Sequence, residues 1–460
     1  MSSFLLEIGL EEVPARFINT CLNDLQSLIL KNLTSHRLVN DQTSIQSYGT
    51  YRRFIIKVDH LLDKQDDIDQ QVDGPPVAIA KSESGDWLPP AIGFAKKMNA
   101  NPDDLIEIKN KKGQSILALQ QFIVGESAFK LLPSIIEDSV YAMKLPIAMK
   151  WGTNTGPFIR PIKWICALLN DSVISVDLFG VKSSNLSYGH RFLTKGNDSS
   201  TGKEIKIDSA SDYISLLDSH HVIIDAKKRQ QLIVDQLLEL NAFSNESEID
   251  SALLQEVCFL VEKPTVLGVP FDESFLQLPK EVLVECLKKH QKAFLAPDND
   301  HVKNTCYIVA DSITEQNKSS VIDGNKRVML ARLNDVQFFW DEDLKENGFG
   351  HWNDKLFNIV FQDGLGSIGD KVERVCHICH TIMDQLDTDK QARDMVDRAA
   401  HRAKADLVSQ MVGELPSLQG TMGGYYGLLF KEDPDVSIAI ADHYKPRFEG
   451  DEMPSSIGGV

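Results

Sequence analysis

The feature that most constrains the fold is a change in the spacing of apolar residues along the chain. Near the N-terminus, Phe4 to Ile8 is a short apolar run and Phe54 to Asp59 repeats with the two-residue period of a strand. Between these segments, apolar residues recur at helical spacing after Pro14. From Asn353 onward helical spacing dominates, as in Met395 to Met411. The sequence therefore predicts an α+β body followed by a mostly helical region.

Length and composition point to several domains. The chain has 460 residues, which is long for a single core, and its 42% hydrophobic and 25% charged residues are ordinary for globular proteins. A polar, turn-rich run near 196–212 is typical of a linker. We predict an α+β N-terminal body over 1–195, an α+β central subdomain over 196–350 and a helical domain over 351–460.

The N-terminus and the cysteines indicate a cytoplasmic protein. No basic, apolar leader precedes the first acidic residues, and no segment is long enough to span a membrane. The seven cysteines are scattered, several of them inside apolar runs, which predicts reduced core thiols. The segment Cys376 to His380 has the residue types of a zinc site, but no second Cys/His cluster lies nearby in the sequence, and we expect no bound metal.

The net charge of −18 argues against a nucleic-acid partner until its distribution is considered. Four windows contain Lys and Arg but no Asp or Glu: Ser139 to Asn170, Leu178 to Asn197, Cys286 to Ala296, and Gly324 to Asn334. Any one window can arise because charge varies by chance along a solvated face. Four together favour a polarised surface with basic faces suited to a polyanion.

Known catalytic motifs are missing from the sequence. Gly364 to Gly369 fits Gly-x-Gly-x-x-Gly, but the following residues Lys371 to Gln385 have helical spacing, so a turn that starts a helix is favoured over a dinucleotide site. There is no Walker sequence, Gly-x-Ser-x-Gly elbow or His-Glu-x-x-His pair. His190 and His290 lie in basic windows, where a phosphate or ribose contact and a structural role are both open.

Taken in order, the remaining motifs resemble those of the β subunit of bacterial glycyl-tRNA synthetase. They are LLEIGLEEVP (Leu5 to Pro14), GTYRR (Gly49 to Arg53), DGPP (Asp73 to Pro76), AIGFA (Ala91 to Ala95), MKWG (Met149 to Gly152), FIRPIKWI (Phe158 to Ile165), GHRF (Gly189 to Phe192), VEKP (Val261 to Pro264), LPKEVL (Leu278 to Leu283), KKHQKAF (Lys288 to Phe294), GNKRVMLARLNDVQFFW (Gly324 to Trp340), LGSIGDKVER (Leu365 to Arg374), KADLVSQMVGELPSLQGTMGGYY (Lys404 to Tyr426) and HYKPRFEGDEMP (His443 to Pro454). The family typically has Met-Arg-Trp-Gly where this chain has MKWG.

The resemblance implies a glycine-tRNA ligase of α2β2 composition, in which the α subunit uses ATP and Mg and this chain binds tRNA(Gly). It implies no cofactor and no catalytic residue in this chain, no membrane or DNA partner, an HD-like helical domain over 351–460, and an anticodon-binding domain that this sequence lacks. The candidate tRNA contacts are Arg52, Arg53, Lys150, Arg160, Lys163, His190, Arg191, Lys292, Arg327 and Arg332.

Two alternatives remain open at this point. One is an HD-type metal-dependent phosphohydrolase, for which His377, His380 and His401 are available but the required His-Asp dipeptide is missing from the sequence. The other is a structural scaffold, in which the basic windows bind acidic surfaces of the α subunit.

Overall fold

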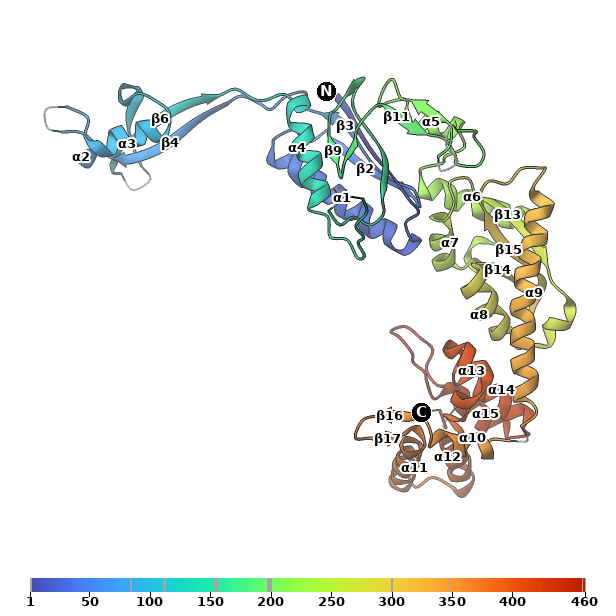
Figure 1. The fold of residues 1–460 in the computed structure, drawn as a ribbon. Coiled ribbons are helices and arrows are strands. Elements are labelled where there is room, and N and C mark those ends of the chain that lie inside the picture. Colours follow the sequence, from blue (N-terminus) through green and yellow to red (C-terminus); the bar gives the residue numbers. More distant parts are fainter. Residues whose placement is uncertain are drawn as a thin grey trace. The chain divides into compact units, whose positions relative to one another are not determined.

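The computed structural model describes residues 2–82, 85–110, 113–152, 156–196, 201–298, 301–346, 348–456 and 458–459. It divides into two compact units: unit 1 is Met1–Arg229 with Phe259–Lys263, and unit 2 is Gln230–Cys258 with Pro264–Val460. Both contain helices and antiparallel sheets, which confirms the predicted α+β class (Figure 1). The predicted limits at 195/196 and 350/351 do not coincide with the border between the units. Of the predicted linker, 197–200 lie outside the described residues.

A five-stranded antiparallel sheet forms the centre of unit 1, in the order β2-β3-β1-β7-β8. Its strands are β1 (Ser2–Leu10), β2 (Ser44–Thr50), β3 (Arg53–Leu61), β7 (Ile162–Leu169) and β8 (Ser172–Val173). Strand β1 is buried on both faces, which explains why its sequence is almost continuously apolar. The strands predicted around Phe4 to Ile8 and Phe54 to Val58 are confirmed.

Helices cover both faces of this sheet. Helix α1 (Ala15–Ser35) begins after Pro14 as predicted, and a Cβ added at Gly49 would meet its Leu22 and Ile18, so α1 covers the face of β2 and β3 that carries Phe54. Helix α4 (Ala128–Tyr141) lies beside α1. On the other face, α5 (Tyr213–Ser219) packs against Leu5 and Ile55.

The rest of unit 1 consists of smaller elements. A three-stranded sheet, β4-β6-β5, is inserted between β3 and α4, and two short helices cover it with Ala91 and Ala95 against Leu117. Helix α3 contains the AIGFA motif, and the DGPP motif ends edge strand β4, where a proline without an N–H is tolerated. The bounds are β4 (Ile68–Pro76), α2 (Val77–Ala80), α3 (Pro89–Lys97), β5 (Leu105–Lys109), β6 (Ser115–Ile123), β9 (Asp177–Leu178), β10 (Val181–Lys182), β11 (Leu186–Tyr188) and β12 (Glu204–Lys206).

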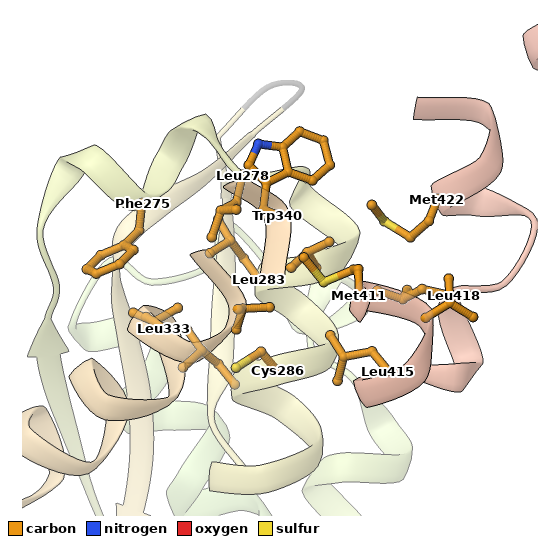
Figure 2. Packing of buried hydrophobic residues seen from close by; sticks show 14 of the residues in the cluster. Phe275, Leu278, Leu283, Cys286, Leu333, Trp340, Met411, Leu415, Leu418 and Met422 are labelled. Carbon is orange, nitrogen blue, oxygen red and sulfur yellow. The ribbon is translucent and has the colours of Figure 1, made fainter. Parts of the chain in front are cut away.

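Unit 2 begins within α6 (Ala226–Glu239) and contains a second three-stranded sheet, β13-β15-β14. The elements of this part are α7 (Ser251–Cys258), β13 (Thr265–Pro270), α8 (Lys280–Gln291), β14 (Phe294–Asp298), β15 (His301–Ala310) and α9 (Lys318–Asp343). Figure 2 shows Leu283 and Cys286 of α8 packed with Leu333 and Trp340 of α9, and with apolar side chains from further along the chain such as Met411. One core therefore joins the sheet to the helical region.

The last hundred residues are mostly helical, as predicted. They contain α10 (Gly350–Leu356), β16 (Val360–Gln362), β17 (Gly366–Ser367), α11 (Ile368–Gln385), α12 (Lys390–Arg402), α13 (Gln410–Glu414), α14 (Thr421–Leu429) and α15 (Pro434–Asp442). The Gly-rich segment supplies the turn and second strand of the β16-β17 hairpin, and Ser367 and Asp370 make a capping box that starts α11. The interpretation of this motif as a turn that starts a helix is confirmed.

The seven cysteines are all free thiols, six buried and Cys379 half-buried, which confirms the prediction of reduced core thiols. Within the described residues, no helix is both long and apolar enough to cross a membrane.

Candidate nucleic-acid interface

The ten predicted tRNA contacts fall into three environments in the structure. Arg52, Arg53 and His190 are fully buried in unit 1. A second group of cations lies at the surface beside carboxylates from other elements. A third group is exposed without an ion pair. Burial and neighbouring charge separate the ten residues by physical role.

Arg53 is the centre of a buried charge cluster. It lies at the start of β3, where its Nε donates to Glu262 Oε1 at 2.8 Å and its NH1 donates to Glu7 Oε1 at 2.7 Å. Thr50 Oγ1 also donates to Glu262 Oε1, at 2.8 Å. Glu7 lies on β1, and Glu262 lies in the short segment Phe259–Lys263 that belongs to unit 1. The cluster therefore ties this late segment to the N-terminal sheet.

Burial and pairing oppose each other in this cluster. Burial disfavours both charges, but the carboxylates of Glu262 and Glu7 raise the pKa of Arg53, and the Arg53 guanidinium holds the pKa of Glu262 below its usual range. Removing one partner would leave a buried charge uncompensated. Arg52 is also buried, and its guanidinium carbon lies 5.8 Å from the centre of the Trp164 ring. These contacts give both arginines a structural role.

His190 caps a turn. Its Nδ1 accepts hydrogen bonds from the backbone amides of Phe192 and Leu193, both at 3.2 Å, while its own amide donates to the carbonyl of His220. Because Nδ1 accepts, the ring carries its proton on Nε2. Of the two roles left open by the sequence, the structure favours the structural one for His190.

Three predicted contacts lie at the surface beside Glu11 and Glu12. Lys163 Nζ lies 3.0 Å from Glu11 Oε1, and Arg191 NH1 lies 2.9 Å from Glu12 Oε1. Arg160 Nε donates to the carbonyl of Glu12 at 3.0 Å. Each window is free of acids in sequence, but the segment after β1 brings two carboxylates to it in space. The inference from acid-free windows to an acid-free surface is therefore wrong here.

The window from Cys286 to Ala296 is neutralised in the same way. Lys292, at the C-terminus of α8, lies 3.0 Å from Glu256 of α7, and Lys289 lies 3.3 Å from Glu285. Lys288 pairs with Asp250. Such surface pairs add little stability, but they lower the positive potential available to a phosphate.

Helix α9 carries exposed cations that form no ion pair with a described residue. Its buried residues recur at three- and four-residue steps, namely Met329, Leu333, Val336, Trp340 and Asp343. Lys326, Arg327 and Arg332 of this helix are exposed and form no ion pair with any described residue. Arg327 makes only a weak hydrogen bond, 3.4 Å from its Nε to the carbonyl of Asp323. Lys150 is likewise exposed and unpaired within the described ranges.

Apolar side chains exposed on the same helix were not predicted from the sequence. Val328, Leu330 and Phe338 are 50%, 42% and 56% exposed. Trp340 belongs to the buried stripe, whereas Phe338, two residues earlier, does not. The spacing of the buried stripe is the signal that would have identified the exposed residues, because none of the three falls on it.

The Cys and His residues of the helical region pair along two neighbouring helices. His380 Nε2 on α11 lies 2.7 Å from Asp397 Oδ1 on α12, and Cys376 Sγ lies 3.4 Å from His401 Nδ1. Across the described part of the chain, no three His, Cys, Asp or Glu side chains are grouped so that they could hold a metal ion.

Comparison with known proteins agrees with the motifs. The family model of the glycyl-tRNA synthetase beta subunit matches residues 4–460. Relatives named glycine-tRNA ligase beta subunit include those of Listeria monocytogenes serovar 1/2a (37% identical over 98% of this chain and 64% of the relative) and Bacillus subtilis strain 168 (39% identical over 99% of this chain and 65% of the relative). The chain thus spans 64 to 65% of the length of these relatives. It belongs to the glycyl-tRNA synthetase beta subunit family.

Proposed function

We propose that this chain is the non-adenylating subunit of an α2β2 glycine-tRNA ligase, and that it binds and positions tRNA(Gly) for glycylation at the active site of a separate α subunit. The proposal extends the names of the relatives to this chain. ATP and Mg supply the chemistry of glycine activation in the α subunit. We assign no catalytic residue to this chain.

The observation that carries the RNA-binding part is the acid-free segment Gly324 to Asn334 of α9, whose cations are exposed. Lys326, Arg327 and Arg332 present three positive charges without carboxylate partners in the described part of a protein whose net charge is −18. Phosphate binding requires cations that are free to displace counterions, and paired lysines such as Lys292 are poorer donors. The acidic residues from Asp335 to Asp343 on the same helix would repel RNA and so limit the contact to the part of the helix before them.

Phosphate contacts fix the register of a nucleic acid without reading its sequence. Bound at α9, the tRNA would be held in one orientation, and holding it there lowers the entropic cost of presenting its acceptor end to the other subunit. This role requires affinity and geometry from the chain, but no proton transfer.

The test is the binding of tRNA(Gly) across a salt series from about 50 to 200 mM, the range over which phosphate-driven affinity falls steeply. We expect the variant K326Q/R327Q/R332Q to bind roughly tenfold more weakly at low salt and to show a salt slope reduced by about 2. The matched control is K96Q/K97Q/K390Q, which removes three exposed lysines that form no ion pair in the described structure. Equal binding by the two triple variants would refute the role of α9.

A second candidate function is a scaffold for the α subunit, which the exposed Val328, Leu330 and Phe338 favour. Aromatic and apolar side chains are enriched at the centres of protein interfaces. If this function dominates, Phe338→Ser will weaken binding to purified α subunit about tenfold or more and leave tRNA binding unchanged. The opposite pattern would leave RNA binding as the function of this helix.

A further inference from the structure

A cavity of about 300 Å³ lies in the helical region of unit 2, among α11, α12 and α15 (Figure 1 labels the three helices). None of the ten predicted tRNA contacts lines it. Its volume is at the lower end of the range for small-molecule sites. A ligand in this cavity would be separate from the tRNA of the proposed function, because the two sites share no residue.

The register of α11 against α12 determines where the charges of this cavity lie. Three contacts join α11 to α12: Cys376 to His401, His380 to Asp397, and Asp384 to Arg393. From one contact to the next the position advances by four residues on α11 and goes back by four on α12, so the helices are antiparallel. Continuing this antiparallel register places Lys371 and Lys404 at the same end of the cavity. His443, directly after α15, also lines it.

The other end of the cavity is apolar. Val375 and Cys379 of α11 and Val396 and Ala399 of α12 line it. The cavity therefore has a basic head and an apolar body.

The basic head has few counter-charges. Neither Lys371 nor Lys404 forms an ion pair with a described carboxylate, and each ammonium instead lies over an aromatic ring, 4.2 Å from the centre of Phe361 and 3.5 Å from that of Tyr444. Arg447 adds positive charge nearby. The closest acid to act on Lys404 is Asp406, whose Oδ2 accepts from the amides of Gly420 and Gly423.

His443 supplies an acceptor that is not used within the protein. Its Nδ1 lies 2.6 Å from the carbonyl of Ile440, so it donates and Nε2 carries the lone pair. Nε2 is buried and has no hydrogen-bond partner among the described residues. Burial, together with repulsion from Lys404, lowers the pKa of His443 to about 4, which keeps the ring neutral at pH 7. A buried acceptor without a partner is costly unless a ligand or water satisfies it.

We infer that this cavity binds a small phosphate monoester with an apolar body, its phosphate held by Lys371 and Lys404 and its body packed against the valines and Ala399. A phosphate matches the head in either of its charge states: the dianion brings two negative charges to two ammonium groups, and the singly protonated form brings one negative charge and offers a P–OH donor to His443 Nε2. A neutral ligand would leave the lysines uncompensated.

The test uses phenyl phosphate as the probe, with inorganic phosphate and phenol as its two halves, titrated into the full 460-residue chain by isothermal calorimetry. We expect saturable binding of phenyl phosphate at millimolar concentration or below, with both halves about tenfold weaker or more. Lys404→Met and Lys371→Met should each weaken binding about tenfold or more, since each removes a charged hydrogen bond.

Lys390→Met is the matched control, because Lys390 is an exposed lysine at the start of α12 away from the cavity, and it should bind like the parent chain. Ala399→Leu fills the apolar end of the cavity, so it should weaken the binding of phenyl phosphate more than that of inorganic phosphate. Circular dichroism checks folding, and Lys371→Met decides the outcome if Lys404→Met does not fold. The inference is overturned if phenyl phosphate fails to bind, or if the lysine variants bind as the control does.

Discussion

Arg53 in unit 1 and Arg327 in unit 2 are both predicted from the sequence to contact tRNA, but their surroundings differ completely. Arg53 is fully buried between Glu7 and Glu262, whereas Arg327 is exposed on α9 and pairs with no carboxylate in the described residues. An arginine of the first kind holds a fold together. One of the second kind is available to a partner.

The difference teaches that carboxylates from distant segments decide which cations are available. The partners of Lys163 and Arg191 come from the segment after β1, far from both residues in sequence. An acid-free window describes the charge of one stretch of the chain only. The potential at the protein surface depends on the charges of all segments that lie near it in space.

The largest expected effect is on stability, when Arg53 is replaced. We expect Arg53→Met to lower the free energy of unfolding by about 3 to 5 kcal/mol, because Glu7 and Glu262 would remain buried without their counter-charge. Arg327→Met should change it by less than about 0.5 kcal/mol. Urea denaturation of both variants makes the comparison. Similar stability of the two would mean that the buried cluster does not stabilise the fold.

Asp406 in unit 2 is a second buried carboxyl group, and its ionisation should lower the free energy of unfolding as the pH rises. Burial raises its pKa to about 6, so between about pH 4 and pH 6 the folded state holds more protons than the unfolded state. The free energy of unfolding should therefore fall by roughly 1 to 3 kcal/mol as the pH rises from about 4 to about 7. Asp406→Asn should remove this dependence. Denaturation curves at several pH values measure it, and an unchanged slope in the variant would contradict the assignment.

Glu262 provides the internal contrast to Asp406. Because Arg53 holds the pKa of Glu262 below its ordinary value, the stability that this carboxylate contributes is present above that ordinary value and is lost as the pH falls through the lowered one. Lowering the pH should therefore destabilise unit 1 through Glu262. In unit 2 it should be stabilising, because Asp406 then becomes protonated and no longer buries a charge.

The smallest expected effect is the difference in tRNA binding between losing a surface cation that has an ion pair and losing one that has none. Arg327→Gln should weaken tRNA binding about three- to tenfold, and Lys163→Gln about twofold or less, because Lys163 is already neutralised by Glu11. Fluorescence anisotropy at low salt can resolve the two. A larger loss for Lys163→Gln would show that its ion pair opens when RNA binds.

Local spacing was enough to predict much of the fold. The strands around Phe4 and Phe54, the helix after Pro14 and the turn that starts α11 follow from the two- and 3.6-residue periods and from capping residues, which act within a few positions. The unit border within α6 was not predicted, because it depends on the later segment Phe259–Lys263 joining unit 1.

The candidate site was predictable only in part. Arg327 and Arg332 are exposed as an RNA contact requires, but nothing near Arg53 in the sequence reveals Glu262, which lies 209 positions away and accepts its hydrogen bond. The basic head of the α11-α12 cavity was not predicted either, because Lys371, Lys404 and His443 lie in three separate motifs of the sequence. Long-range contacts of this kind are set by topology rather than by local pattern.

Glycylation of tRNA(Gly) by purified α subunit tests the central claim most directly. The reaction would be measured with α alone, with α plus this chain, and with α plus K326Q/R327Q/R332Q, at varied concentrations of tRNA, glycine and ATP. We predict that the chain stimulates charging, and that the triple variant raises KM for tRNA while leaving KM for glycine and ATP unchanged. Full charging by α alone, or an unchanged KM for tRNA in the variant, would contradict the claim that this chain holds the tRNA through α9.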